Sequence, residues 1–188
     1  MTRGGETQTG RRSRRLLAPL AGVALLAIAL AERFRRRRGE QTEGRRQMSE
    51  ANKTVSRRLT EEAFNQGKYD VIEELVAPTF VNHDPATGDT KGPEGTRELI
   101  EGYRSAFPDI KITVEEQIAE GDLVVTRWTG TGTHKGELMG IAPTGKGTTV
   151  TGVTIDKIKD GKIVESWNNW DTLGLMRQLG VVPEMATA

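Results

Sequence analysis

The chain has 188 residues, of which 35% are hydrophobic, so it is long enough for one domain with a buried core and an extension. It contains no cysteine, which excludes disulfides, thiolate metal sites and a cysteine nucleophile. The formal net charge is +1, but residues 1–47 hold 12 of the 27 basic and 4 of the 26 acidic residues, so this segment carries +8 and the remainder −7. A mildly acidic body gives no electrostatic reason to expect nucleic acid as a partner.

Residues 1–47 form a basic extension that contains an uncharged apolar run at residues 16–31. Three interpretations of it stay open. It is a slightly short membrane anchor held on the cytoplasmic side by the arginines at 35–38, or an export signal with a twin-arginine motif at 13–17 and a cleavage pattern at 29–31. The third is a start that is not native, because Met48 opens a sequence typical of a whole domain. We expect a cytoplasmic domain over residues 48–188, with or without membrane association through residues 16–31, and favour export less.

From residue 48 onward the hydrophobic pattern predicts helices first and strands afterwards. Apolar residues at helical spacing predict helices over residues 52–65, 69–76 and 93–107. A short extended stretch lies at 79–83. From residue 110 the period falls to two, which predicts four long strands, the later three over residues 123–134, 148–159 and 163–171. This order predicts an α+β fold, a curved antiparallel sheet folded over helices, and not a parallel βαβ architecture.

Residues 161–180 place one carboxylate, Asp171, where the last strand meets a helix. Strict alternation from Ile163 puts Trp167 and Asp171 on one face of that strand, and Gly180 stands where the helix should end. Asp171 is either the N-cap of this helix or a poorly solvated carboxylate beside indole rings, with a raised pKa suited to acid/base chemistry. Both can hold, since one oxygen can cap while the other faces a cavity.

Several other polar and aromatic residues are candidates for a pocket. His83, after Asn82 at the end of the short strand, is a turn cap or a pocket acid/base group, and His134 beside a glycine-rich connection is either exposed or in contact with the pocket. Arg127 inside a strand favours an ion pair with Glu165 on a neighbouring strand. The tryptophans at 128, 167 and 170 are either core or cavity lining.

Two further site types are rejected from the sequence. With two histidines and no zinc-type i, i+4 spacing, we predict no metal site. Residues 140–147 nearly spell a phosphate-binding loop, but Gly147 stands where that motif needs Ser or Thr, and a predicted strand follows instead of a helix.

The domain resembles the SnoaL-like polyketide cyclase family, also called ester cyclases, over nearly all of residues 50–183. The matching segments are FVNHDP at 80–85, GYRSAFPD at 102–109, EGDLVVTRW at 120–128, GTHKG at 132–136, PTGK at 143–146, and much of 161–180. The extension, residues 1–47, lies outside the resemblance.

The resemblance implies a conical α+β fold shared with ketosteroid isomerase, usually as a homo-oligomer, with no metal and no organic cofactor. It implies closure of a ring in a small apolar polyketide-like molecule by an intramolecular aldol reaction, with an acid/base Asp that matches Asp171. A non-catalytic binding module for an apolar ring compound is the alternative. We predict Asp171 and His83 as catalytic, and as substrate-binding residues Asn82, Tyr103, Phe107, Arg127, Trp128, His134, Trp167 and Asn169.

Overall fold

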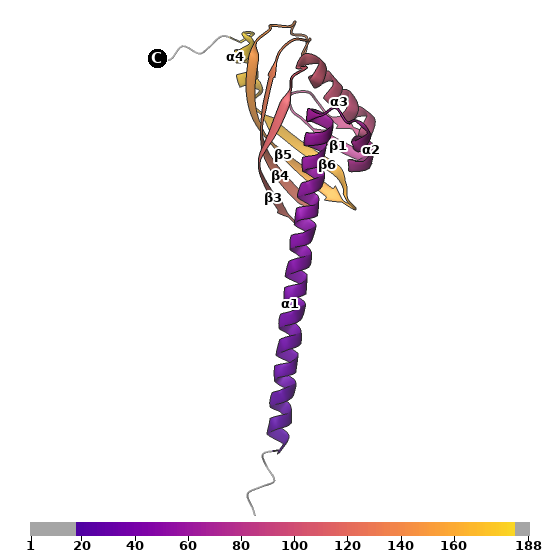
Figure 1. Cartoon of the computed structure of the whole chain (residues 1–188), viewed down its shortest axis with the longest axis vertical. Coiled ribbons are helices and arrows are strands. Elements are labelled where there is room, and N and C mark those ends of the chain that lie inside the picture. The colour runs from indigo at the N-terminus through magenta and orange to yellow at the C-terminus, as the bar shows by residue number, and fades with distance from the viewer. Residues whose placement is uncertain (1–17, 183–188) are drawn as a thin grey trace, which may run out of the picture. The chain divides into compact units, whose positions relative to one another are not determined.

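The computed structural model describes residues 18–182, with side chains from residue 30 onward (Figure 1). The chain divides into two compact units, Met1–Gly44 and Arg45–Ala188, and helix α1, Ala18–Arg58, contributes to both. The twin-arginine motif at 13–17 and the beginning of the apolar run at 16–31 lie outside the described residues. Within the part that is described, no helix combines the length and apolar character needed to cross a membrane.

The helices of the second unit follow the predicted order. The end of α1 continues into the π-helical segment η1, Leu59–Asn65, which is followed by α2, Asp70–Leu75, and α3, Gly92–Ala106. Arg104 of α3 donates hydrogen bonds to the backbone oxygens of Phe64 and Asn65, at 2.5 and 3.1 Å. These carbonyls end η1 and lack helical partners, so Arg104 satisfies them and fixes α3 against η1.

Within the described residues, six strands form one sheet in the order β2-β1-β6-β5-β4-β3. The strands are β1 Val76–His83, β2 Thr90–Lys91, β3 Lys111–Glu120, β4 Leu123–Thr133, β5 Gly147–Lys159 and β6 Lys162–Trp170. As predicted, β3 to β6 are antiparallel neighbours. One pair departs from the antiparallel pattern, because β1 pairs with β6 in parallel. Pro78 lies within β1, where the pairing with β6 is irregular between Val76 and Val81, so a missing backbone donor is tolerated.

The sheet curves, and α2 and α3 lie against one of its faces (Figure 1). Two groups of buried apolar residues fill the space between helices and sheet. The first consists of Ala63, Ile72, Val76, Phe80, Ile100, Val124, Ile158 and Ile163. The second consists of Ala106, Phe107, Leu138, Leu175 and Leu179. We call them the first and the second core cluster.

The strand-to-helix junction forms where the sequence predicted it. Helix α4 spans Thr172–Leu179, and Gly180 follows it in the left-handed conformation with φ of 82°, which glycine adopts without strain. Asp171 is the N-cap of α4, because its Oδ1 accepts a hydrogen bond from the backbone N–H of Gly174 at 2.8 Å. The capping interpretation of Asp171 is therefore confirmed.

Replacing Asp171 with Ala is expected to lower the free energy of unfolding by about 1 kcal/mol, the usual effect of losing an N-cap. Asp171→Asn is the control, since an asparagine oxygen can still accept the Gly174 N–H and should change stability by a few tenths of that amount. Urea unfolding followed by circular dichroism measures both. Equal destabilisation by the two variants would contradict a capping role.

Candidate active site

A β-bulge near the start of β6 decides which of its side chains face the helices. The pairing of β6 with β5 shifts between Ile163 and Glu165, so Val164 is an extra residue. Ile163 is fully buried in the first core cluster, and beyond the bulge Ser166, Asn168 and Trp170 lie on the cavity-lining face. Strict alternation from Ile163, which favoured Trp167 and Asp171, therefore selected the wrong face.

Ser166, Asn168 and Trp170 line a cavity of about 180 Å³ between the two core clusters. Phe80 of the first cluster and Phe107 of the second contribute to its walls. An apolar cavity of roughly 150 Å³ holds a molecule of the size of benzene. The site therefore has room for a ring-sized portion of a ligand.

One row of polar side chains crosses the sheet at one end of this cavity. Asn82 on β1 pairs in register with Ser166 on β6, and Ser166 pairs with Asp156 on β5. All three residues line the cavity. The Ser166 hydroxyl donates a short hydrogen bond of 2.5 Å to Oδ1 of Asp156. Asn82 and Asp156 are two strands apart, which places their backbones roughly 10 Å from each other.

Asp156 is the one carboxylate among the cavity-lining residues in the described part of the chain. Asp156 is 6% exposed. Burial raises the pKa of Asp156 above the ordinary aspartate value, because the charged form loses its hydration, while the hydroxyls of Ser166 and Ser56 lower it to a smaller extent. A carboxylate whose charged form is disfavoured in this way is suited to take up a proton and return it.

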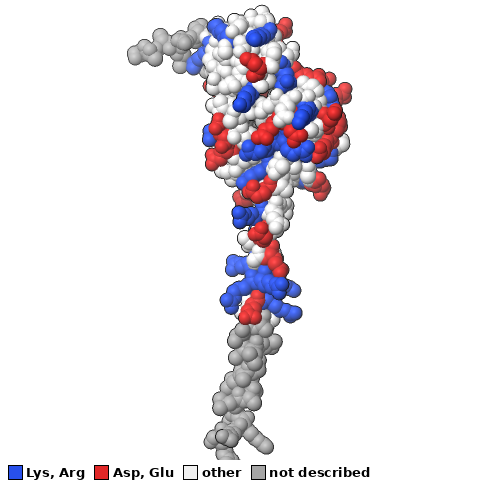
Figure 2. Space-filling model, in the orientation of Figure 1, with Lys and Arg blue, Asp and Glu red and all other residues white. Residues whose placement is uncertain are grey.

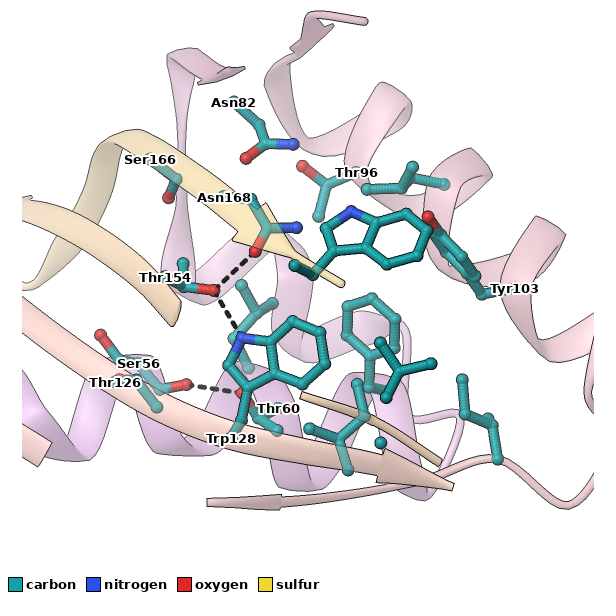
Figure 3. Close-up of a pocket in the computed structure, with 18 of the residues that line it drawn as sticks. Ser56, Thr60, Asn82, Thr96, Tyr103, Thr126, Trp128, Thr154, Ser166 and Asn168 are labelled. Atoms are coloured by element: carbon teal, nitrogen blue, oxygen red, sulfur yellow. Dashed lines mark hydrogen bonds between the residues drawn. The ribbon is translucent and has the colours of Figure 1, made fainter. Parts of the chain in front are cut away.

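A chain of hydrogen bonds runs along the sheet beside this polar row (Figure 3). The indole Nε1 of Trp128 donates to the Thr154 hydroxyl at 3.0 Å, and that hydroxyl donates to Oδ1 of Asn168 at 2.9 Å. The Nδ2 of Asn168 then donates to Oδ2 of Asp84 at 3.1 Å. An ionised carboxylate only accepts hydrogen bonds, so Asp84 fixes which side of the Asn168 amide faces Thr154.

Asp84 is buried outside the cavity lining and accepts four hydrogen bonds. Its Oδ2 receives Asn168 Nδ2 and the indole Nε1 of Trp170, both at 3.1 Å. Its Oδ1 receives the backbone N–H groups of Ala86 and Thr87, at 2.8 and 3.3 Å. Asp84 therefore orients two cavity walls and the loop that follows β1 at the same time.

Gly152 of β5, two residues before Thr154, lies between tryptophans of the two neighbouring strands. Gly152 pairs with Trp128 on β4 and with Trp170 on β6. A Cβ atom at position 152 would overlap the six-membered ring of Trp128. Glycine is required here because the Trp128 side chain lies across the strand and fills the place of a side chain.

Gly152→Ala is expected to lower the free energy of unfolding by about 1–3 kcal/mol, the usual cost of overpacking, and to displace the Trp128 indole from Thr154. Gly147→Ala is a matched control at the first residue of the same strand, because a Cβ there meets no atom within 4 Å. Urea unfolding and tryptophan emission report the two effects. Similar stabilities for the two variants would contradict the close packing described for Gly152.

Asn82 and Tyr103 are cavity-lining donors that lack a protein partner in the described part of the chain. The side chain of Asn82, 7% exposed, makes no hydrogen bond within the described residues, and neither does the hydroxyl of Tyr103. Burial and the nearby charge of Asp84 raise the pKa of Tyr103, so its hydroxyl keeps its proton and can donate. These groups can bind a carbonyl or enolate oxygen of a ligand, which carries its own acceptors.

The sequence model of the SnoaL-like polyketide cyclases matches residues 54–179, which include the cavity and most of the second unit. The chain belongs to this family. Two relatives are the nogalonic acid methyl ester cyclase of Streptomyces nogalater and an aklanonic acid methyl ester cyclase of Streptomyces galilaeus. The first is 34% identical over 122 residues, or 63% of this chain and 90% of the relative. The second is 32% identical over 137 residues, or 71% and 92%.

Solved structures of SnoaL-like proteins have the same fold. The structure of a family member from Jannaschia sp. CCS1 superposes with a TM-score of 0.66 at 27% identity, covering 72% of this chain and 95% of that one. The predicted α+β fold is therefore confirmed for this SnoaL-like domain.

The cavity of this SnoaL-like protein contains four of the predicted site residues, Asn82, Tyr103, Phe107 and Trp128. The sequence prediction did not include Asp156, Ser166, Asn168 and Thr154, which lie at alternate positions of β5 and β6. Among the described residues, no three side chains of the types that bind metals are placed to hold an ion.

The other predicted residues lie outside the cavity lining. Asp171 is exposed as the cap of α4, and Asn169 is exposed on the opposite face of β6. His83 faces outward because the register of β1 pairs it with Trp167, and the two rings stack at 5.7 Å. The Nε2 of His83 lies 3.2 Å from Glu165 Oε1.

Arg127 and His134, which were predicted to bind substrate, also lie outside the cavity lining. The Nε of Arg127 lies 3.7 Å from Oε2 of Glu116 on β3, and not near the expected Glu165. His134 is fully buried, and its Nδ1 accepts a hydrogen bond from the backbone N–H of Thr144 at 3.3 Å. Arg127 belongs to an exposed strand face, whereas His134 holds the glycine-rich connection between β4 and β5.

Proposed function

We propose that the protein closes a ring in a small polyketide-like substrate by an intramolecular aldol reaction that needs no cofactor, with Asp156 as the acid/base group. The observation that supports this assignment is the burial of Asp156 as the carboxylate of the cavity lining, hydrogen-bonded to Ser166. Asp171 and His83 lie outside the lining, so we assign them no chemical step.

The reaction uses the same carboxylate twice. Asp156 takes a proton from the carbon next to a substrate carbonyl, which leaves an enolate and a protonated Asp156. The enolate carbon attacks a second carbonyl carbon of the same molecule, forming the ring bond and an alkoxide. Asp156 then returns its proton to this alkoxide, so the product is an isomer of the substrate.

The neutral groups of the cavity hold the reacting oxygens. Asn82 is next to Ser166 in the row that contains Asp156, so its free amide donors can stabilise the enolate oxygen. Tyr103 supplies a second donor, and Trp128 and Trp170 provide flat apolar walls for a ring system. Apolar side chains of the two core clusters line the cavity and lower its local dielectric constant, which strengthens these interactions.

The experiment is incubation of the purified full chain with nogalonic acid methyl ester or aklanonic acid methyl ester in D₂O. We expect a ring-closed isomer with a new retention time, and deuterium in the remaining ester at the carbon from which Asp156 takes its proton. Both should depend on Asp156. Recovery of unchanged, unlabelled ester from a saturated complex would contradict the proposal and favour the non-catalytic binding module.

A further inference from the structure

The stretch of α1 at residues 30–38 combines arginines with exposed apolar side chains. Arg33 and the four arginines at 35–38 occupy five of the seven positions between Glu32 and Glu40, and we call them the arginine collar. With 3.6 residues per turn, five nearly consecutive side chains point to all sides of a helix. Figure 2 shows basic side chains projecting to both sides of the helix here.

The arginine collar is free to bind an external partner. Every residue at 30–38 is exposed. Arg36 lies 3.3 Å from Glu40, with side-chain exposures of 84% and 66%, and such an exposed ion pair contributes little. Guanidinium groups donate paired hydrogen bonds to phosphate oxygens, so phosphate is the group that this surface fits.

Leu30 and Phe34 indicate that this phosphate belongs to a lipid. They are 45% and 70% exposed. Their i, i+4 spacing places them on one face of the helix, and the uncharged run at residues 16–31 precedes them in the sequence. Apolar and aromatic side chains beside arginines are typical of the interface between headgroups and acyl chains, whereas nucleic acid requires only the charge.

We propose that the arginine collar, with Leu30 and Phe34, binds the surface of a bilayer that contains anionic phospholipids. Surface binding of this kind needs no spanning helix. It holds the chain at a membrane through headgroup phosphates and a shallow apolar contact, independently of the reaction in the cavity.

The test is co-sedimentation of the full chain with vesicles of phosphatidylcholine alone, or of phosphatidylcholine and phosphatidylglycerol at about three to one, in about 0.1 M NaCl. We expect binding to the anionic vesicles that falls at about 1 M NaCl, where charges are screened. Replacing the four arginines at 35–38 with Gln should weaken this binding roughly 600-fold, at about fivefold for each charge near the surface. Phe34→Ser should weaken it as well.

A second quadruple variant is the matched control, with Gln at the exposed lysines Lys91, Lys111, Lys135 and Lys159 of the second unit. It removes the same charge and should bind anionic vesicles as the wild type does. The proposal is overturned by absent binding, by equal binding to the two kinds of vesicle, or by equal losses in the two quadruple variants. Tighter binding to duplex DNA than to anionic vesicles would also overturn it.

Discussion

Asp156→Asn is expected to lower kcat for ring closure by about 10²–10⁴-fold, the contribution of a positioned general acid or base. Asparagine has nearly the size of aspartate and can accept the Ser166 hydrogen bond, but it cannot take up the substrate proton. Binding of the ester should therefore persist while turnover is lost. Steady-state kinetics and ligand titration on the same preparation separate the two effects.

Asp171→Asn is the matched control for this prediction. Asp171 caps α4 and lies outside the cavity lining, so its amide variant should keep kcat within about twofold of the wild type. The opposite result, with turnover lost in Asp171→Asn and kept in Asp156→Asn, would return the acid/base role to the carboxylate that the sequence alone favoured.

Stability provides a check on the Asp156→Asn variant itself. Burial raises the pKa of Asp156 in the folded state, so the stability that Asp156 contributes is complete below its unfolded pKa and is lost as the pH rises through the folded pKa. Asparagine has no such loss. The free energy of unfolding of the variant, relative to the wild type, should therefore increase as the pH is raised.

Asp84→Ala is expected to lower the free energy of unfolding by about 2–4 kcal/mol, because it leaves buried donors on Asn168 and Trp170 without an acceptor. It also frees the backbone N–H groups that begin the loop after β1. We expect weaker ligand binding in addition, since both side chains are cavity walls. Urea unfolding gives the stability, and the emission of Trp170 reports the loss of its hydrogen bond.

Asp89→Ala is the control for the same loop. Asp89 is exposed and lies 3.4 Å from His83, and an exposed pair of this kind should contribute less than about 1 kcal/mol. If Asp84→Ala were no more destabilising than Asp89→Ala, the four hydrogen bonds of Asp84 would not hold the cavity wall as described.

The sequence predicted the elements well because their signals are local. The end of α4 at Gly180 and its N-cap at Asp171 each depend on residues a few positions apart. The long strands follow from alternating apolar residues. The parallel pairing of β1 with β6 was missed, because strand partners depend on contacts across the fold that no local pattern contains.

The candidate site was only partly predicted, because the face on which a side chain lies depends on how regular its strand or helix is. The faces of β4 and α3 follow regular periods, so Trp128 and Tyr103 were predicted correctly as pocket residues. The face of β6 did not follow its period, since the bulge at Val164 exchanges inward and outward positions for the rest of the strand. One extra residue thus moved the prediction from Ser166 and Asn168 to Trp167 and Asn169.

The pH dependence of kcat in the wild type and in Ser166→Ala tests the role of Asp156 most directly. We predict that kcat in the wild type rises with pH through one ionisation above the ordinary range of aspartate, because the base must lose its proton. Removing the Ser166 hydroxyl removes a hydrogen bond that lowers the pKa of Asp156, so the rise should move to higher pH in Ser166→Ala. A pH profile that is flat, or that is the same in both proteins, would contradict Asp156 as the acid/base group.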